Sequence, residues 1–570
     1  MRRWLPLLAA VGCGSGEEVP ATGGPEEVTA ESARTQAMRV SMAVRGHRPS
    51  LEELDAVSED PTVLPSLLET WMASPAFGET IRHMHADVLL TRTARSALPA
   101  VGPLAGETRN DLSAVVTEEP LALIEHIVLD DRPYTEVVTA DYTVVGELAP
   151  TMFADLSRES GPGDQVAVYT DGRPAAGILS TNGLWLRFQS AGQNYQRQRA
   201  NAIASALLCA SYDDRDIPIS GDIDLSDDEA LANALNTQAE CVACHQTLDP
   251  LGSHLFTIRS VLNVNNVQIA YANGCAGQAA ASCYPLPVYV PQGADRWRRF
   301  GTRPPGYYGS ESDDLGTLGA HIAADPRFAQ CTVRRFVSYL TQTPADELTI
   351  PELAPLQARF VDSGFDARDL VEAIVLDPAF AQPDDEDGIG LMATRPFQLA
   401  ATVEDLTGFR FVFNFDGAPC RQNGTNCRGD IDVVYDDTLG FRSMAGGIDG
   451  FRVTRPTWTT TPTKALFVAA LAEEAAGHVV DADFASPAAD RHLLGDVEAD
   501  TDDETAVRAQ LVTVHRRFFG IEVDADNPEI DEAFGLFDAA RSRRSGPSAA
   551  AEAWKVTLTG LLQDPRILLY

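Results

Sequence analysis

Lysine is nearly absent from this 570-residue sequence, where only Lys464 and Lys555 occur, so arginine carries almost all of the positive charge. Lysine and arginine together number 44 against 82 aspartates and glutamates, which gives a formal net charge of -38. Such an excess of negative charge disfavours binding to nucleic acid or anionic lipid and would attract cationic partners. We therefore expect no nucleic-acid partner, and the charge also serves solubility.

The sequence also lacks the short motifs of several enzyme classes. It contains no G-x-S-x-G, H-E-x-x-H or phosphate-binding loop pattern, so hydrolase and nucleotide-binding functions have no support. No later stretch reaches the ~18 continuous apolar residues that a membrane-spanning helix needs. The sequence therefore gives no support for a hydrolase, a nucleotide-binding protein or a protein with a membrane-spanning helix after the N-terminus.

One motif with a specific chemistry is present, the pentapeptide Cys241-Val242-Ala243-Cys244-His245. At the C-x-x-C-H spacing, two thiols can add to the vinyl groups of one haem while the adjacent imidazole reaches the iron. We predict one covalent haem c, with Cys241 and Cys244 forming the thioethers and His245 as the proximal ligand. A carbonyl near Asp249-Pro250 is expected to accept a hydrogen bond from the other ring nitrogen.

A disulfide or a metal site at the same cysteines stays an alternative. Zinc would need two more ligands at a similar spacing, and the sequence has no second C-x-x-C and no H-x-x-x-H. The capping pattern Ser226-Asp227-Asp228-Glu229 predicts a helix that runs toward Ala239. The motif is therefore expected at a helix end.

The N-terminus has the pattern of an export signal. Arg2 and Arg3 precede an apolar run from Trp4 to Val11, and Ala10-Val11-Gly12-Cys13 resembles a bacterial lipobox with alanine in place of the usual leucine. We predict a lipoprotein signal peptide at residues 1–13 and a flexible tether at 14–30, with membrane attachment only by lipid on Cys13. Ordinary secretion and no cleavage remain open. The predicted location is the periplasm or cell surface of a Gram-negative-type bacterium.

The remaining cysteines agree with an oxidising compartment. Without Cys13 and the two motif cysteines, six are left, an even number that allows three disulfides. Two pairs would close short loops and the third would be long-range: Cys275–Cys283, Cys420–Cys427 and Cys209–Cys331. The alternative for Cys209 is a buried free thiol in an apolar run.

Hydrophobic spacing predicts a mainly α, multi-helical and multidomain fold with long loop-rich insertions and few short strands. Ser or Asp before Pro recurs at residues 74, 325, 377 and 564, where it is typical of helix starts. The predicted segments are an N-terminal helical domain (31–130), a mixed segment with the haem motif (131–260), a loop-rich insertion with short strands (261–310), a helical domain (311–382) and a C-terminal helical domain (383–570) with an irregular insertion (411–456).

The residues around the motif resemble a known family. Glu240-Cys241-Val242-Ala243-Cys244-His245-Gln246-Thr247-Leu248-Asp249-Pro250-Leu251-Gly252 is similar to the haem segment of planctomycete-type cytochrome c proteins, large exported proteins that also occur in myxobacteria. Arg45-Gly46-His47-Arg48-Pro49-Ser50 with Ala73–Gly78 resembles their N-terminal helical domain, and Cys331–Phe380 the helical domain after the haem. The resemblance covers about residues 35–382, and a weaker similarity extends to residues 395–408 and 561–570. It implies haem, a cytochrome c-like segment, export and a helical architecture, but no reaction.

The sixth iron ligand would decide between electron transfer and catalysis. In Arg82-His83-Met84-His85, helical spacing places His85 on the apolar side and His83 on the side of Asp87. His85 is the leading candidate, with a core histidine bonded to a backbone carbonyl as the alternative; His321 is next. Arg197 and Arg199 are candidates for pairing with haem propionates, or are solvated surface residues.

The sequence thus predicts an exported c-type haem lipoprotein that transfers electrons to a redox partner protein, or oxidises an unknown substrate shaped by the loops at 261–310 and 411–456. A single C-x-x-C-H argues against a two-haem peroxidase. The alternative is a non-enzymatic cell-surface binding protein with a structural or sensory haem. Whether the chain is an enzyme stays open.

Overall fold

The computed structural model describes residues 30–93, 98–190, 194–214, 227–381, 391–413, 431–435 and 440–570. The described part is mainly helical with a few short strands, which confirms the mainly α, multi-helical part of the predicted fold class. The predicted signal peptide, Cys13 and nearly all of the tether lie outside it, as do Cys420 and Cys427. None of the described helices combines the length and apolarity needed to cross a membrane.

The helices before residue 390 are α1 (Ala30–Arg45), α2 (Leu51–Glu59), α3 (Leu64–Met72), α4 (Pro75–Leu89), α5 (Arg109–Thr117), α6 (Glu119–Leu129), α7 (Glu136–Thr139), α8 (Ala149–Met152), α9 (Asn182–Arg187), α10 (Arg197–Leu208), α11 (Asp228–Thr237), α12 (Ala239–Ser253), α13 (Val264–Ala272), α14 (Arg296–Arg299), α15 (Leu315–Ala324), α16 (Pro326–Thr341), α17 (Ile350–Asp362), α18 (Ala367–Val375) and α19 (Pro378–Ala381). The later helices are α20 (Pro396–Thr407), α21 (Phe441–Met444), α22 (Pro462–Ala485), α23 (Glu504–Phe519), α24 (Pro528–Ser542), α25 (Ala549–Leu561) and α26 (Pro565–Leu568).

The recurring Ser-Pro and Asp-Pro pairs mark helix starts, as predicted. Ser74 caps α4 by accepting from the backbone N–H of Phe77, and Asp325 and Asp564 accept likewise at the starts of α16 and α26. Asp377 accepts from the N–H of Ala379 in α19. Proline in the first turn needs no hydrogen bond from its nitrogen, so the same dipeptide ends one helix and begins the next.

Strands are few and short. An antiparallel sheet has the order β1-β3-β2, formed by β1 (Thr143–Val145), β2 (Leu156–Arg158) and β3 (Gln165–Tyr169). In its register, Thr143 pairs with Ala167 and Leu156 with Tyr169. Two-stranded pairs join β4 (Gly306–Tyr307) to β5 (Ser310–Glu311) and β6 (Val412–Phe413) to β7 (Ile431–Asp432).

Segment 261–310 is less loop-like than predicted. Residues Val264–Ala272 form the helix α13, and within residues 288–290 a single bridge joins Tyr289 to Ile258. Asn263 caps α13 by accepting from the N–H of Asn265, so a local cap starts a helix within a polar sequence.

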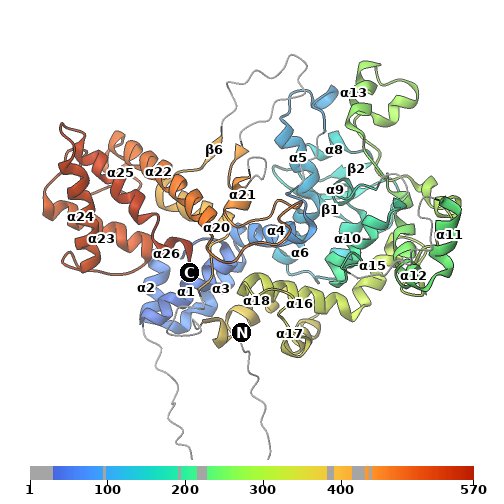
Figure 1. Ribbon diagram of the computed structural model, residues 1–570, viewed down its shortest axis with the longest axis horizontal. Coiled ribbons are helices and arrows are strands. Elements are labelled where there is room, and N and C mark those ends of the chain that lie inside the picture. Colours follow the sequence, from blue (N-terminus) through green and yellow to red (C-terminus); the bar gives the residue numbers. More distant parts are fainter. Residues whose placement is uncertain are drawn as a thin grey trace, which may run out of the picture.

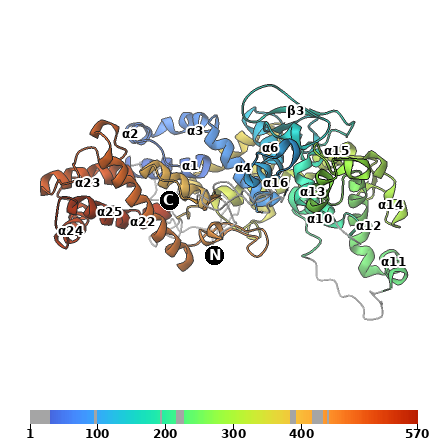
Figure 2. The same ribbon diagram turned by 90° about the horizontal axis from the view of Figure 1, so that it is seen from above.

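The molecule is elongated, and its described residues form two large hydrophobic cores and a small cluster of Val145, Ala149 and Ala167. Figure 1 shows α22–α25 at one end, α1–α4 in the middle and α10–α15 at the other end, and Figure 2 shows the same order from above. The first core extends from Ala33 to Phe397, and the second from Leu399 to Leu568. Segments 31–130, 131–260, 261–310 and 311–382 therefore share one core, whereas the predicted break near 383 lies close to the division between the cores.

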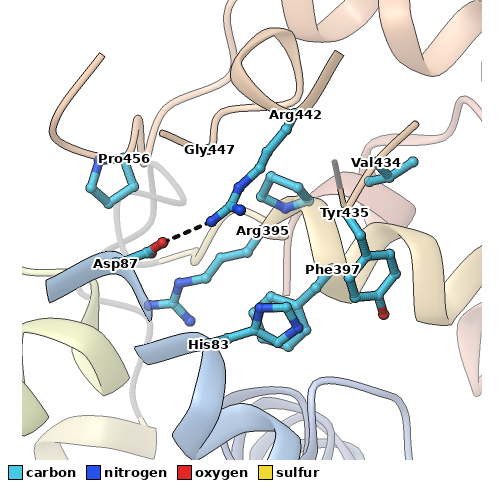
Figure 3. Close-up of a pocket in the computed structure, with 10 residues that line it drawn as sticks. His83, Asp87, Arg395, Phe397, Val434, Tyr435, Arg442, Gly447 and Pro456 are labelled. Atoms are coloured by element: carbon cyan, nitrogen blue, oxygen red, sulfur yellow. Dashed lines mark hydrogen bonds and ion pairs between the residues drawn. The ribbon is translucent and has the colours of Figure 1, made fainter. Parts of the chain in front are cut away.

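A small pocket lies near this division (Figure 3). It is lined from α4 by His83 and Asp87, from the start of α20 by Arg395, Pro396 and Phe397, and from later segments by Val434, Tyr435, Arg442, Gly447 and Pro456. It thus brings together residues more than 300 positions apart in the sequence.

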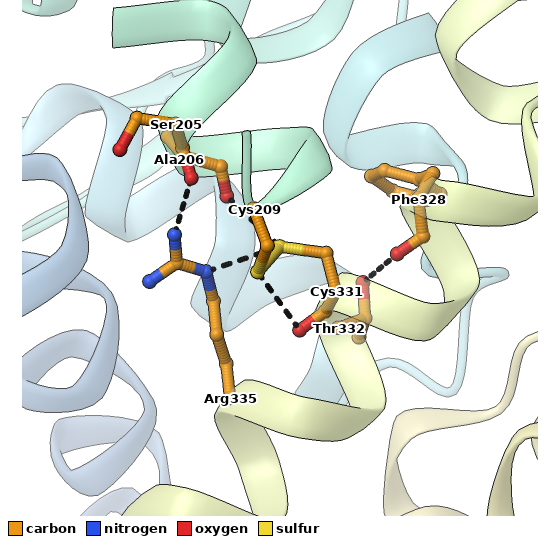
Figure 4. The surroundings of a disulfide bond; sticks show 7 residues. All are labelled: Ser205, Ala206, Cys209, Phe328, Cys331, Thr332 and Arg335. Atoms are coloured by element: carbon orange, nitrogen blue, oxygen red, sulfur yellow. Dashed lines mark hydrogen bonds between the residues drawn. A yellow bond between two sulfur atoms is a disulfide. The ribbon is translucent and has the colours of Figure 1, made fainter. Parts of the chain in front are cut away.

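Two of the three predicted disulfides are present, Cys275–Cys283 and Cys209–Cys331. The second joins the end of α10 to α16 (Figure 4), so Cys209 is not a free thiol. Arg335 of α16 lies beside it and donates from Nη2 to the carbonyl of Ser205 at 2.5 Å. The Cys420–Cys427 pair falls outside the described residues.

Candidate functional site

The C-x-x-C-H motif lies in the first two turns of α12. Asp227 caps the preceding helix α11 by accepting from the backbone N–H groups of Glu229 and Ala230. Helix α11 ends at Thr237, and α12 begins two residues later at Ala239 and packs against it. The motif therefore occupies the start of a second helix, and Ser226 of the predicted capping box lies outside the described part of the chain.

Helical geometry places the three motif side chains on one face. Relative to Cys241, Cys244 is three residues and His245 four residues further along α12, and residues at these spacings are neighbours on a helix surface. Both cysteines remain thiols; Cys244 is buried and Cys241 partly exposed. The arrangement brings two thiols and one imidazole to a common side of α12.

Asp249 holds His245 from one turn further along the same helix. The Nδ1 atom of His245 lies 2.9 Å from Oδ1 of Asp249, and Nε of Arg197 on α10 donates to the same oxygen at 2.8 Å. Arg303 adds its Nη1 atom at 3.6 Å from Oδ2. Asp249 is only 4% exposed, so these contacts form inside the protein.

The charge state of Asp249 follows from these contacts. Burial alone would raise its pKa, but hydrogen bonds from His245 and Arg197, with the charge of Arg197, outweigh burial and hold the pKa below its ordinary value. An ionised carboxylate only accepts hydrogen bonds, so Nδ1 of His245 carries the proton. With Nδ1 used in this hydrogen bond, Nε2 is the ring atom left to bind a metal.

The hydrogen-bond acceptor of His245 differs in kind from the predicted one. The prediction named a carbonyl near Asp249 as the acceptor. The position is right, but the acceptor is the Asp249 carboxylate rather than a backbone carbonyl. The spacing from His245 to Asp249 is four residues, so a helix through the motif would have placed both side chains on one face. That spacing is the signal by which the sequence could have revealed Asp249.

The two arginines predicted near the haem have different surroundings. Arg197 reaches the motif through Asp249. Arg199 is fully buried and donates to backbone carbonyls, including those of Trp185 at 3.0 Å and Arg259 at 2.8 Å, and burial lowers its pKa to about 9. The prediction placed Arg199 either at a haem propionate or on the solvated surface. The structure places it inside the protein, where backbone carbonyls accept its hydrogen bonds.

His85 lies in the core of the first half of the chain. Its Nδ1 atom is 2.7 Å from the carbonyl of Ile81, its Nε2 atom is 2.7 Å from the hydroxyl of Tyr134, and burial lowers its pKa to about 4. Both nitrogens thus have partners, as in the core-histidine alternative, and a role on iron would require breaking the contact with Tyr134. His321 stacks on Tyr307 and contacts the carbonyl of Glu311.

Within the described ranges, no three His, Cys, Asp or Glu side chains gather to form a metal site. A zinc site built only from protein ligands is therefore not formed there. A haem needs fewer protein ligands, because its porphyrin supplies four nitrogen donors to the iron.

Comparisons with protein-family models, with curated proteins and with solved structures find no match to this chain.

Proposed function

We propose that this chain is an exported c-type haem protein that transfers electrons, or oxidises a substrate, at one haem carried by α12. Cys241 and Cys244 form the thioethers and His245 binds the iron through Nε2. The single observation that carries the proposal is the hydrogen bond between Nδ1 of His245 and the buried Asp249 carboxylate.

Metal-bound histidines usually donate their other ring N–H to a carboxylate or carbonyl, which fixes the tautomer and the ring orientation. In this chain Asp249 holds that proton on Nδ1, and Arg197 and Arg303 hold Asp249 in turn. When bound, the haem supplies one-electron exchange at its iron. The residues of the chain attach it, orient the imidazole and hold a proton on its Nδ1 atom.

The oxidising compartment is supported by the rest of the molecule. Disulfides Cys209–Cys331 and Cys275–Cys283 are typical of exported proteins, whereas the motif cysteines stay as thiols three residues apart. The resemblance to planctomycete-type cytochrome c proteins points the same way. The lipid anchor on Cys13 and the bacterial cell surface or periplasm belong to the same proposal.

The test is expression of the full chain with the machinery that attaches haem c. We expect one covalently bound haem by intact mass and a c-type α band in the reduced-minus-oxidised spectrum. The double variant Cys241→Ala/Cys244→Ala should lose both signals. The matched control Cys275→Ala/Cys283→Ala removes a cysteine pair far from the motif and should keep them, and His245→Ala should keep the covalent mass but lose the normal iron spectrum.

A second cytochrome expressed in the same cells shows that the haem-attachment machinery works. If that cytochrome matures but this protein stays colourless and lacks the added mass, the proposal is wrong. Carbon monoxide then separates the two activities. If the reduced protein binds it readily, the iron has an open position suited to oxidation of a substrate; if it does not, electron transfer is favoured.

A further inference from the structure

A buried arginine without enough partners lies at the pocket between α4 and α20 (Figure 3). Arg395 is 6% exposed, its guanidinium lies 3.7 Å from the ring centre of Tyr339, and Nη2 donates to the carbonyl of Tyr339. Its Nε and Nη1 atoms have no hydrogen-bond partner among the residues that the structure describes. Buried charged donors without acceptors are costly, so the site is suited to an added anion.

The charged side chains that line the pocket are two arginines, Arg395 and Arg442, and one aspartate, Asp87. Arg442 is also 6% exposed, and its Nη2 atom pairs with Oδ1 of Asp87 at 3.0 Å. Burial, together with the charge of Arg92, lowers the pKa of His83 to about 4, so this ring is neutral at pH 7. Arg395 therefore has no ion-pair partner among the side chains that line the pocket, in a chain whose formal charge is -38.

A second buried cation lies close to Arg395. Lys464 of α22 is 1% exposed and donates from Nζ to the carbonyl of Thr394 at 2.5 Å. Burial, and then the charge of Arg395, lower the pKa of Lys464 to about 8. Two cations thus repel each other inside the protein, and an anion between α4 and α20 would relieve that repulsion.

The other walls are flat and apolar. The ring of His83 stacks on Phe397 with centres 4.1 Å apart and an angle of 14° between the planes, and Tyr435 lies 5.5 Å from His83. Pro396, Val434 and Pro456 complete the apolar lining. A few charged donors within an apolar wall are typical of sites for small organic ligands.

We propose that this pocket binds a small organic monocarboxylate, whose carboxylate accepts hydrogen bonds from the unused donors of Arg395 and whose flat apolar body lies against Phe397 and Tyr435. Its negative charge would lie among the positive charges of Arg395, Arg442 and Lys464. Guanidinium–carboxylate hydrogen bonds are among the strong ones, because both partners are charged. The site contains none of the motif residues on α12, so it does not depend on haem.

The test is calorimetric titration of the purified full chain with benzoate, the probe that combines one carboxylate with a flat body. We expect saturable binding of one benzoate per chain, with no comparable binding of the neutral isostere benzamide. Arg395→Gln should weaken the affinity at least about tenfold, the effect of losing a charge-assisted contact. The matched control Arg455→Gln changes an arginine whose side chain is 80% exposed and should leave the affinity unchanged.

Arg395 also holds the carbonyl of Tyr339, so circular dichroism and the melting temperature are measured for each variant. If Arg395→Gln does not fold, Phe397→Leu, which removes the flat wall and keeps the charge, decides the question: weaker benzoate binding supports the proposal and unchanged binding overturns it. No saturable benzoate binding, equal binding of benzamide, or binding of inorganic phosphate in preference to benzoate would also overturn it.

Discussion

At the scale of single residues, Asp249 connects the motif to the rest of the protein. It accepts from His245 on its own helix and from Arg197 on α10, and it lies close to Arg303. A carboxylate with three such neighbours fixes both the tautomer and the orientation of the imidazole. It is a positioning residue, because it acts on the haem site only through His245.

Replacement of Asp249 by Asn is expected to lower the free energy of unfolding by about 2 kcal/mol at pH 7, because Arg197 loses a charged acceptor inside the protein. The folded pKa of Asp249 lies below the unfolded value of about 3.9. Its contribution is therefore present above that value and is lost as the pH falls through the folded pKa. Urea denaturation between pH 7 and pH 2.5 should show the wild-type and Asp249→Asn values converging in acid.

The control for this experiment is Asp295→Asn, since the side chain of Asp295 is 81% exposed and pairs with the exposed Arg298. Its effect should stay within about 0.5 kcal/mol at every pH. A constant difference between wild type and Asp249→Asn down to the lowest pH would contradict the proposed charge state of Asp249.

At the scale of elements, the Cys209–Cys331 disulfide fixes α10 against α16. Helix α10 also carries Arg197 and the buried Arg199. The guanidinium of Arg199 donates to backbone carbonyls of neighbouring segments. Movement of α10 would therefore shift the arginine that holds Asp249. The disulfide lies far from the motif in sequence but supports the helix that faces it.

The two disulfides should differ in their effect on stability. Cys209–Cys331 closes a loop with a separation of 122 residues and Cys275–Cys283 one of 8 residues. Loop-closure entropy predicts losses of about 5 and about 2.5 kcal/mol for the respective double alanine variants. Chemical denaturation of both variants without reductant measures the difference. Equal losses, or a larger loss for the short loop, would contradict this explanation.

At the scale of the whole molecule, the last residues join the two cores. The backbones of Met392 and Tyr570 exchange two hydrogen bonds of 2.8 Å, and Thr394 donates to the carbonyl of Leu568 at 2.8 Å. Ile567 is fully buried in the second core, whereas Tyr570 packs against the first. Unfolding of either half would therefore disturb the other.

Deletion of residues 567–570 is expected to separate the two cores in a thermal scan. It removes these backbone bonds and the buried side chain of Ile567, which alone contributes about 2–5 kcal/mol. Scanning calorimetry should show one main transition for the full chain and two for the truncated chain. Tyr570→Phe removes only the hydroxyl, which accepts from Gln342 and Gln398, and should keep one transition. An unchanged scan after the deletion would contradict the joining role.

The sequence by itself determined much of the local structure. Spacing of apolar residues predicted a mainly helical chain, and Ser-Pro and Asp-Pro pairs gave four helix starts. Two cysteine pairs were also right. These features depend on neighbours in the chain, or on a small number of possible cysteine pairings. They can therefore be predicted from the sequence alone.

Only the tertiary structure decided which residues meet. It placed Arg199 inside the protein, set the hydroxyl of Tyr134 against His85, and brought Arg197 to the Asp249 carboxylate. It also brought Arg395 and Arg442 to the side of α4 that carries His83 and Asp87. Burial and charge compensation arise from side chains that lie far apart in the sequence, and no local pattern records them; packing in three dimensions therefore decides where a buried charge finds its partner.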